Sequence, residues 1–166
     1  MRVPIRKGGQ YTFMPNDPKM TEAKLNEFKK SLVHLKKDIQ PPLIQEVKRL
    51  SLLGDFSENA EYQIAKGRLR STNQKILKLE QQIATAQIIK FPQDKTRVQI
   101  GSSVTVVVNE QEYQYHILGS AETNPATGTI SYQSPLGLAL LNKKVNDVAE
   151  LKLADRTVNY KIIKIN

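Results

Sequence analysis

Two long segments with helical spacing of apolar residues, joined across one short break, constrain the fold of this chain most. In the first segment, apolar residues recur three and four positions apart from Leu25 to Ile39, which is the spacing of a coiled-coil stripe. The second segment repeats this spacing from Tyr62 to Ala86, where Thr72 breaks its apolar character. Because each stripe needs a partner and the break is short, the two segments are predicted to form an antiparallel helical hairpin.

The ends and the interruption of this hairpin also have sequence signals. Pro18 is a reasonable first-turn residue and Thr21 is a competing N-cap, whereas Gly54 is expected to cap the end of the first arm. Pro41 and Pro42 lack backbone N–H donors, so the first arm is predicted to kink or restart there. With some thirty residues per arm, the hairpin would form a rod of about 45 Å. A hairpin folded flat on the rest of the protein, or packed in a bundle, remains open.

Composition limits the class of protein. There is no cysteine, hence no disulfide framework and no thiolate zinc site, and His34 and His116 are too few for a histidine-based metal site. No apolar run approaches the roughly 18 residues of a membrane span, and the N-terminus has charge but no apolar leader, so we expect a cytosolic protein with no membrane contact. Residues 1–17 are polar, rich in Gly and Pro, and expected to form a flexible arm.

The pattern changes after the sequence FPQD at residues 91–94. Apolar and β-branched residues then alternate or run continuously, and they predict strands at 103–108, 112–118, 129–132, 149–153 and 157–165. Ser134 followed by Pro135 predicts the start of a short helix between the third and fourth strands. The expected fold is therefore α+β: a helical hairpin over residues 18–92, followed by a small antiparallel sheet domain over residues 93–166.

The net charge of +9 is concentrated in the first half of the chain. Residues 1–92 contain 17 Lys and Arg against 9 Asp and Glu, whereas residues 93–166 contain 8 against 7. A basic surface attracts phosphate backbones, so this distribution favours a nucleic-acid partner, although net charge also serves solubility.

Two carboxylates, Asp55 and Glu58, fall at the break between the predicted helices, near the tip at residues 54–58. Carboxylates three residues apart can share a hard cation such as Mg²⁺, but they supply too few oxygens for its octahedron, so water or a partner must supply the rest. The same spacing fits a capping box at the start of the second helix. Ser57 could cap equally well, which would leave both carboxylates available for another role.

Longer strings resemble a known family. The tip sequence GDFSENAEY at residues 54–62 strongly resembles the tip motif of the bacterial Gre transcript-cleavage factors. The stretch from SPLG to LNKKVND at residues 134–147 resembles that family's second motif, and Gln40 with the two following prolines matches a break in its first helix. The resemblance implies an antiparallel coiled coil and a C-terminal domain of FKBP-like fold. Residues 63–70, together with the basic first half, resemble the GreB branch more than GreA.

The resemblance also implies partners. In this family the C-terminal domain docks at the rim of the secondary channel of bacterial RNA polymerase, and the coiled coil enters the channel to reach backtracked nascent RNA. Such a protein is an accessory factor rather than a freestanding enzyme, and it has no small-molecule substrate. Candidates for polymerase docking are Ser134, Pro135, Leu136 and Gly137. Candidates for RNA contact are Lys48, Arg49, Lys66, Arg68 and Arg70, which on residue type alone fit a solvated helix flank equally well.

The tip acids are implied to have the catalytic role. By position, Asp55 and Glu58 correspond to the residues that help hold a second Mg²⁺ inside the polymerase active centre and orient the attacking water. No metal is expected on the protein alone. Glu61 belongs to the motif but is a weaker candidate, and Tyr62 is expected to pack rather than react.

Two other functions are compatible with this shape. A non-catalytic channel-binding regulator, or an inhibitor of cleavage, would share the hairpin, but the presence of both tip acids favours an activator. A peptidyl-prolyl isomerase is suggested by an FKBP-like domain, but aromatic residues make up only 6% of the chain. No aromatic-lined pocket is legible in the sequence.

Overall fold

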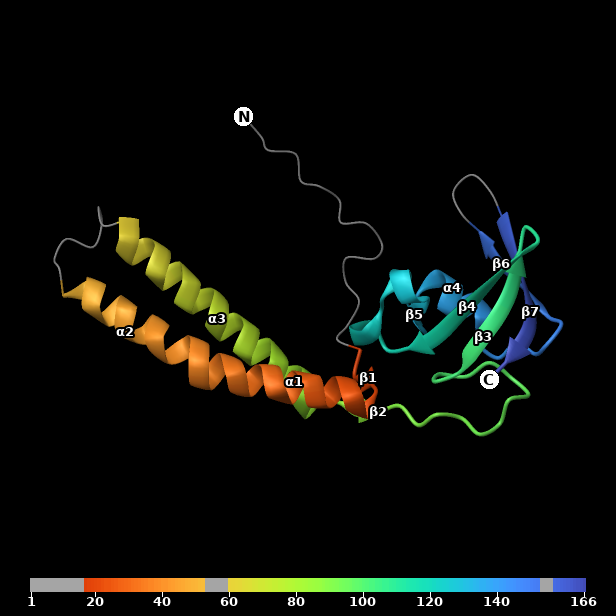
Figure 1. Ribbon diagram of the computed structural model, residues 1–166, viewed down its shortest axis with the longest axis horizontal. Coiled ribbons are helices and arrows are strands. Elements are labelled where there is room, and N and C mark those ends of the chain that lie inside the picture. The colour runs from red at the N-terminus through yellow and green to blue at the C-terminus, as the bar shows by residue number, and fades with distance from the viewer. Residues whose placement is uncertain (1–16, 53–59, 153–156) are drawn as a thin grey trace, which may run out of the picture.

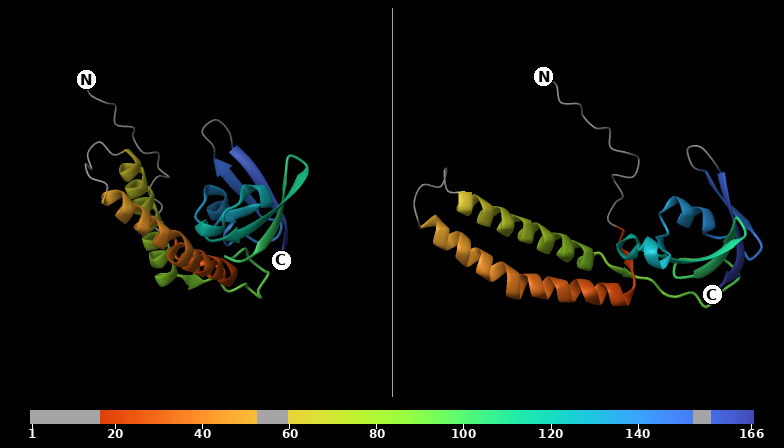
Figure 2. Two further views of the ribbon diagram at one scale, coloured as in Figure 1. Left: turned by 60° about the vertical axis from the view of Figure 1, so that its left-hand side comes forward. Right: turned by 45° about the horizontal axis from the view of Figure 1, so that its top comes forward.

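A long helical hairpin projects from a small sheet domain in the computed structural model, which describes residues 17–52, 60–152 and 157–166 (Figure 1). The first arm consists of α1 (Glu22–His34), the π-helical turn η1 (Leu35–Ile39) and α2 (Gln40–Ser51). The second arm is α3 (Ala60–Ala84). The two further views in Figure 2 show both arms running side by side away from the sheet domain. The predicted hairpin is confirmed.

The first arm restarts where the prolines predicted an interruption. The backbone N–H of Gln40 donates to the carbonyl of Leu35, five residues back, so the chain widens into a π turn before α2 begins. Pro41 and Pro42 then occupy the first turn of α2, the part of a helix where proline is best tolerated. Thr21 is the N-cap of α1, and its side chain accepts from the N–H of Lys24 at 3.3 Å.

The apolar stripes of the two arms meet along the hairpin. Leu50 on α2 and Ala65, Thr72 and Ile76 on α3 are buried, and the remaining stripe positions are half-buried. Polar groups also join the arms, since the Nε2 of Gln40 donates to the Oδ1 of Asn73 at 2.8 Å. Stripe packing of this kind stabilises helices that would be marginal alone. None of the helices in the described ranges has the length and apolarity needed to cross a membrane.

The sheet domain contains five strands in the order β5-β4-β3-β7-β6. Their bounds are β3 Ser103–Val108, β4 Gln111–Leu118, β5 Thr129–Ser131, β6 Val148–Lys152 and β7 Thr157–Ile165, all close to the predicted ranges. Three neighbouring pairs are antiparallel, but β4 and β5 are parallel, so the sheet is mixed where an antiparallel one was expected. The connection between β4 and β5 contains two 3₁₀ turns, η2 (Ser120–Glu122) and η3 (Pro125–Thr127), and returns the chain to the start of β5, which then runs parallel to β4.

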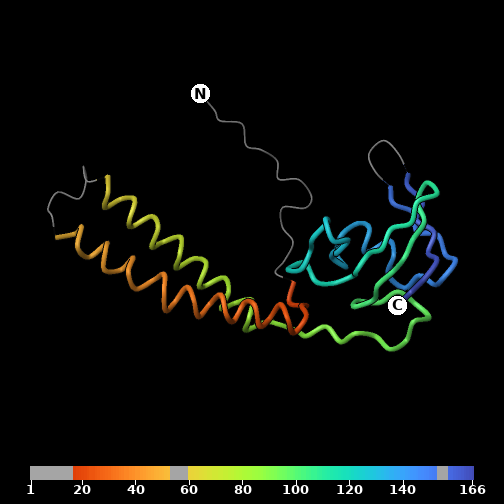
Figure 3. Tube along the Cα trace, viewed as in Figure 1, coloured from red at the N-terminus to blue at the C-terminus, as the bar shows by residue number. Residues whose placement is uncertain are grey.

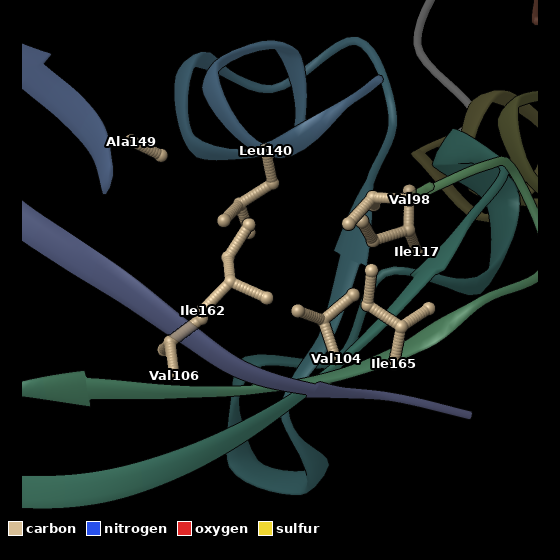
Figure 4. Packing of buried hydrophobic residues seen from close by; sticks show 8 residues of the cluster. All are labelled: Val98, Val104, Val106, Ile117, Leu140, Ala149, Ile162 and Ile165. Atoms are coloured by element: carbon tan, nitrogen blue, oxygen red, sulfur yellow. The ribbon is translucent and has the colours of Figure 1, made fainter. Parts of the chain in front are cut away.

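One helix, α4 (Pro135–Leu140), covers a face of this sheet and closes the core. Figure 4 shows Leu140 pointing from α4 toward the strand residues Val106 and Ile162. These side chains are fully buried. The β3–β4 turn consists of Asn109 and Glu110, both with positive φ, as a tight two-residue hairpin requires.

A short parallel pair at the base of the hairpin was not predicted. β1 (Lys19–Met20) precedes α1, β2 (Gln87–Ile88) follows α3, and the two strands pair where the chain enters and leaves the hairpin. Met20 is buried there, as is Ile89 just beyond β2. From β2 the chain runs as an extended linker to the sheet domain, which is easiest to follow in the tube view of Figure 3.

Candidate functional site

The residues predicted to act at the tip lie outside the described residues. Asp55 and Glu58 fall in the range 53–59, as does the predicted cap Gly54, so their roles stay predictions. The described ends of the flanking helices are Ser51 and Ala60, and both lie at the end of the hairpin remote from the sheet domain (Figure 1). Over its 25 residues, α3 spans about 38 Å.

Basic side chains near that remote end are exposed. Lys66 and Arg70, which are one helical turn apart, both line a groove of about 470 Å³ on α3, together with Leu69, Asn73, Gln74 and Leu77. The ammonium group of Lys66 lies 5.7 Å from the ring centroid of Tyr62, which is half-buried. This groove combines two cations with apolar side chains, a surface suited to a phosphate-bearing chain.

The other three RNA-contact candidates are exposed but lie outside this groove. Lys48 and Arg49 are in the last turn of α2, where the negative end of the helix dipole stabilises cations. Arg68 is on α3 and does not line the groove with Lys66 and Arg70. Of the five candidates, Lys66 and Arg70 are the two that share this groove.

The four docking candidates at the start of α4 are mostly engaged within the domain. The Oγ of Ser134 donates to the carbonyl of Ser131 at 2.6 Å and accepts from the N–H of Gly137 at 3.0 Å, as an N-cap does. Gly137 is buried, and a Cβ there would lie 2.1 Å from the carbonyl oxygen of Ser131. Leu136 packs against the core, so Pro135 is the exposed member of the four.

A further exposed residue on α4 was missed by the sequence reasoning. Leu138 is 61% exposed, three residues after Pro135, so the two lie close on the outer side of the helix. The signal that could have found it is helical spacing within α4, because Leu136 and Leu140 occupy the inward positions.

The structure contains an aromatic-lined groove that the sequence did not reveal. Tyr113, Tyr115 and Tyr160 line it, and its volume is about 610 Å³. The rings of Tyr113 and Tyr115 are stacked with centroids 6.5 Å apart, and Tyr160 meets Tyr115 edge-on at 6.4 Å. Burial, with smaller contributions from the two neighbouring phenols, raises the pKa of Tyr115. These tyrosines come from β4 and β7, which flank β3, so the sheet brings together residues distant in sequence.

Both histidines have polar partners. The Nδ1 of His34 lies 2.7 Å from the Oδ2 of Asp38, and the Nδ1 of His116 lies 2.7 Å from the Oγ of Ser103. Within the part of the chain that the structure describes, no three His, Cys, Asp or Glu side chains come together as a metal-binding group.

Comparison with known proteins gives two family matches that together cover most of the chain. Residues 18–88 match the family described as transcription elongation factor, N-terminal, and residues 93–166 match transcription elongation factor, GreA/GreB, C-term. A protein of Macrococcus caseolyticus named transcription elongation factor GreA is 36% identical over 156 residues, covering 92% of this chain and 99% of the relative. A protein of Nitratiruptor with the same name is 34% identical over 151 residues, covering 88% and 91%.

Solved structures were also similar to this chain. The GreA factor homolog 1 of Thermus thermophilus aligns at 21% identity with a TM-score of 0.42, covering 90% of this chain and 99% of that one. A GreA/GreB elongation factor from Nitrosomonas europaea aligns at 17% identity with a TM-score of 0.40, covering 89% and 98%.

Proposed function

The chain belongs to the GreA/GreB family of transcription elongation factors, accessory factors of RNA polymerase, and from this premise we propose that it stimulates transcript cleavage. The protein enters the secondary channel of bacterial RNA polymerase and promotes cleavage at the 3′ end of backtracked nascent RNA, which releases arrested complexes. The observation that carries this proposal is the shape of the described hairpin. Its two arms end together, remote from the sheet domain, and the segment between them contains Asp55 and Glu58.

In this proposal the two tip carboxylates act inside the polymerase active centre. Carboxylate oxygens are hard ligands that suit Mg²⁺, but two of them leave the octahedron incomplete, so the ion is shared with the polymerase and water. A bound Mg²⁺ would supply charge stabilisation for RNA hydrolysis. Asp55 and Glu58 would help to hold this ion and to orient the attacking water, and Glu61 is a weaker candidate for assisting them. The chain alone needs no bound cofactor.

The remaining proposed contacts follow from exposure and charge. Lys66 and Arg70 contact the phosphates of the extruded RNA through their shared groove, without reading its bases. Arg68, Lys48 and Arg49 are further candidates for this contact. The outer side of α4 docks at the channel rim through Pro135, whereas Ser134, Leu136 and Gly137 hold α4 in place for docking.

A non-catalytic channel-binding regulator or an inhibitor of cleavage is the alternative. The presence of both tip acids favours the activator. The test is to add the unmutated protein to a backtracked elongation complex and measure RNA cleavage over time. Faster cleavage supports the proposal, whereas slowed or unchanged cleavage by a polymerase that binds the protein would establish the alternative.

The branch of the family is decided by the same experiment. Residues 63–70 resemble GreB, whereas the relatives from Macrococcus caseolyticus and Nitratiruptor are named GreA. The lengths of the released RNA fragments, compared with those from a GreA and a GreB protein on the same complex, distinguish the two patterns.

A further inference from the structure

Two carboxylates, Asp17 and Glu122, join the base of the hairpin to the sheet domain. The Oδ2 of Asp17 accepts from the backbone N–H of Ser120 at 2.7 Å, and its Oδ1 accepts from the hydroxyl of Tyr132 at 2.9 Å. The same Oδ1 also accepts from the N–H of Lys19, in β1, at 3.0 Å. Asp17 therefore ties the entry of the hairpin to two separate points of the sheet domain.

The second carboxylate belongs to the sheet domain and accepts hydrogen bonds from the hairpin. Glu122, in η2 of the sheet domain, accepts from both the hydroxyl and the backbone N–H of Thr21. Thr21 is also the N-cap of α1, so this carboxylate lies at the positive end of the helix dipole, which favours negative charge. The first turn of the rod is thus held from outside by the sheet domain.

Close packing leaves little freedom around these bonds. A Cβ on Gly119 would lie 1.8 Å from the carbonyl oxygen of Lys19, so the backbones of β1 and the sheet domain touch. The ammonium group of Lys19 lies 5.0 Å from the ring centroid of Tyr132. Burial and the hydrogen bond to Asp17 raise the pKa of Tyr132, so its hydroxyl stays protonated and able to donate. On the exit side, the linker residue Pro92 packs against Gly101, whose Cβ would lie 2.9 Å from it.

We propose that Asp17 is a positioning residue, which acts with Tyr132 and Glu122 to hold the hairpin at one fixed angle to the sheet domain. This inference rests on the proposed function, because a fixed angle matters when the sheet domain docks outside and the tip must reach a distant active centre. A rod of about 38 Å that rotates by about 10° at its base moves its far end by about 7 Å. A displacement of about 1 Å in reacting groups can already lower a rate roughly a hundredfold.

Because the chain has no cysteine of its own, spin labels can be attached at two chosen positions to measure this angle. Cysteines introduced at the exposed residues Gln45, on α2, and Lys161, on β7, take spin labels whose separation reports the orientation of hairpin and sheet domain. The labelled protein with an unmutated junction is expected to give a narrow distance distribution. The labelled double variant, Asp17→Ala with Tyr132→Phe, is expected to give a wider one. The matched control is Asp147→Ala, which removes a carboxylate that accepts from the N–H of Lys144 within the sheet domain.

The functional half of the test uses the same variants without labels. We expect the maximal rate of cleavage at saturating factor to fall roughly tenfold or more in the double variant. The concentration for half-maximal cleavage should stay within about threefold, because the docking residues on α4 are unchanged. Tyr132→Phe alone keeps the ring and removes one hydroxyl, so it gives a milder test if the double variant does not fold.

Each outcome decides something different. An unchanged distance distribution in a folded junction variant overturns the proposal. A wider distribution with an unchanged maximal rate overturns the positioning role. Failure of the unmutated protein to stimulate cleavage would instead refute the proposed function, and the distance measurement would still decide whether Asp17 fixes the angle.

Discussion

Two leucines near the remote end of the first arm test whether the hairpin is held together by its apolar stripe. Leu50 is 2% exposed and Leu52 is 79% exposed, although they are two residues apart. Full burial of a leucine side chain contributes about 1.5–3 kcal/mol, and the cavity left by truncation adds to the loss. Leu50→Ala is therefore expected to lower the free energy of unfolding by about 2–5 kcal/mol. The exposed Leu52→Ala should change it by less than about 0.5 kcal/mol.

Urea unfolding followed by far-ultraviolet circular dichroism measures this difference, because most helical residues belong to the hairpin. Hydrogen exchange of the amides of α2 and α3 shows whether the loss is global or confined to the remote end of the rod. If the remote end of the hairpin opens locally, the measured loss in the free energy of global unfolding will be smaller than about 2–5 kcal/mol. Hydrogen-exchange protection of the amides at that end should then fall in Leu50→Ala but not in Leu52→Ala. Equal effects of the two substitutions on both measurements would refute the packing argument.

Three further predictions concern the surfaces of the molecule. Lys66→Ala with Arg70→Ala should weaken cross-linking to extruded RNA and flatten its salt dependence, whereas Lys29→Ala with Lys30→Ala, exposed on α1, should leave both unchanged. Burial raises the pKa of Tyr115, so the neutral phenol favours the folded state. Its contribution to the free energy of unfolding is fully present below the ordinary tyrosine pKa of about 10 and is lost as pH rises through the raised pKa. An absorbance titration should accordingly show a late-ionising tyrosine component that decreases in Tyr115→Phe. Proline peptides should isomerise at their uncatalysed rate in the presence of the protein, because hydroxyl and amide groups of tyrosine, threonine and asparagine line much of the groove; catalysed isomerisation would contradict the accessory role.

The hairpin was readable from the sequence because its pattern is long and local. The spacing from Leu25 to Ile39 and from Tyr62 to Ala86 marks the residues that the structure buries or half-buries, and Thr72 is buried with them. The cap at Ser134 was equally legible, because serine before proline is a local signal that needs no tertiary partner.

Features that depend on distant residues were not readable. The parallel pairing of β5 depends on the path of the connection from β4, which no local pattern reveals, and the β1–β2 pair has two residues per strand, too few for an alternating pattern. The junction at Asp17 and the groove at Tyr115 join residues far apart in sequence. The helix that carries the docking candidates was predicted, but the burial of Gly137 depends on its contact with Ser131, which the sequence does not reveal.

The central claim is that the hairpin delivers the carboxylates of its tip into another macromolecule's active centre. Its most direct test is Asp55→Ala on a backtracked elongation complex, with polymerase binding measured by competition against the unmutated protein. We predict that stimulated cleavage is lost while binding is retained. Full stimulation of cleavage by Asp55→Ala would contradict the account.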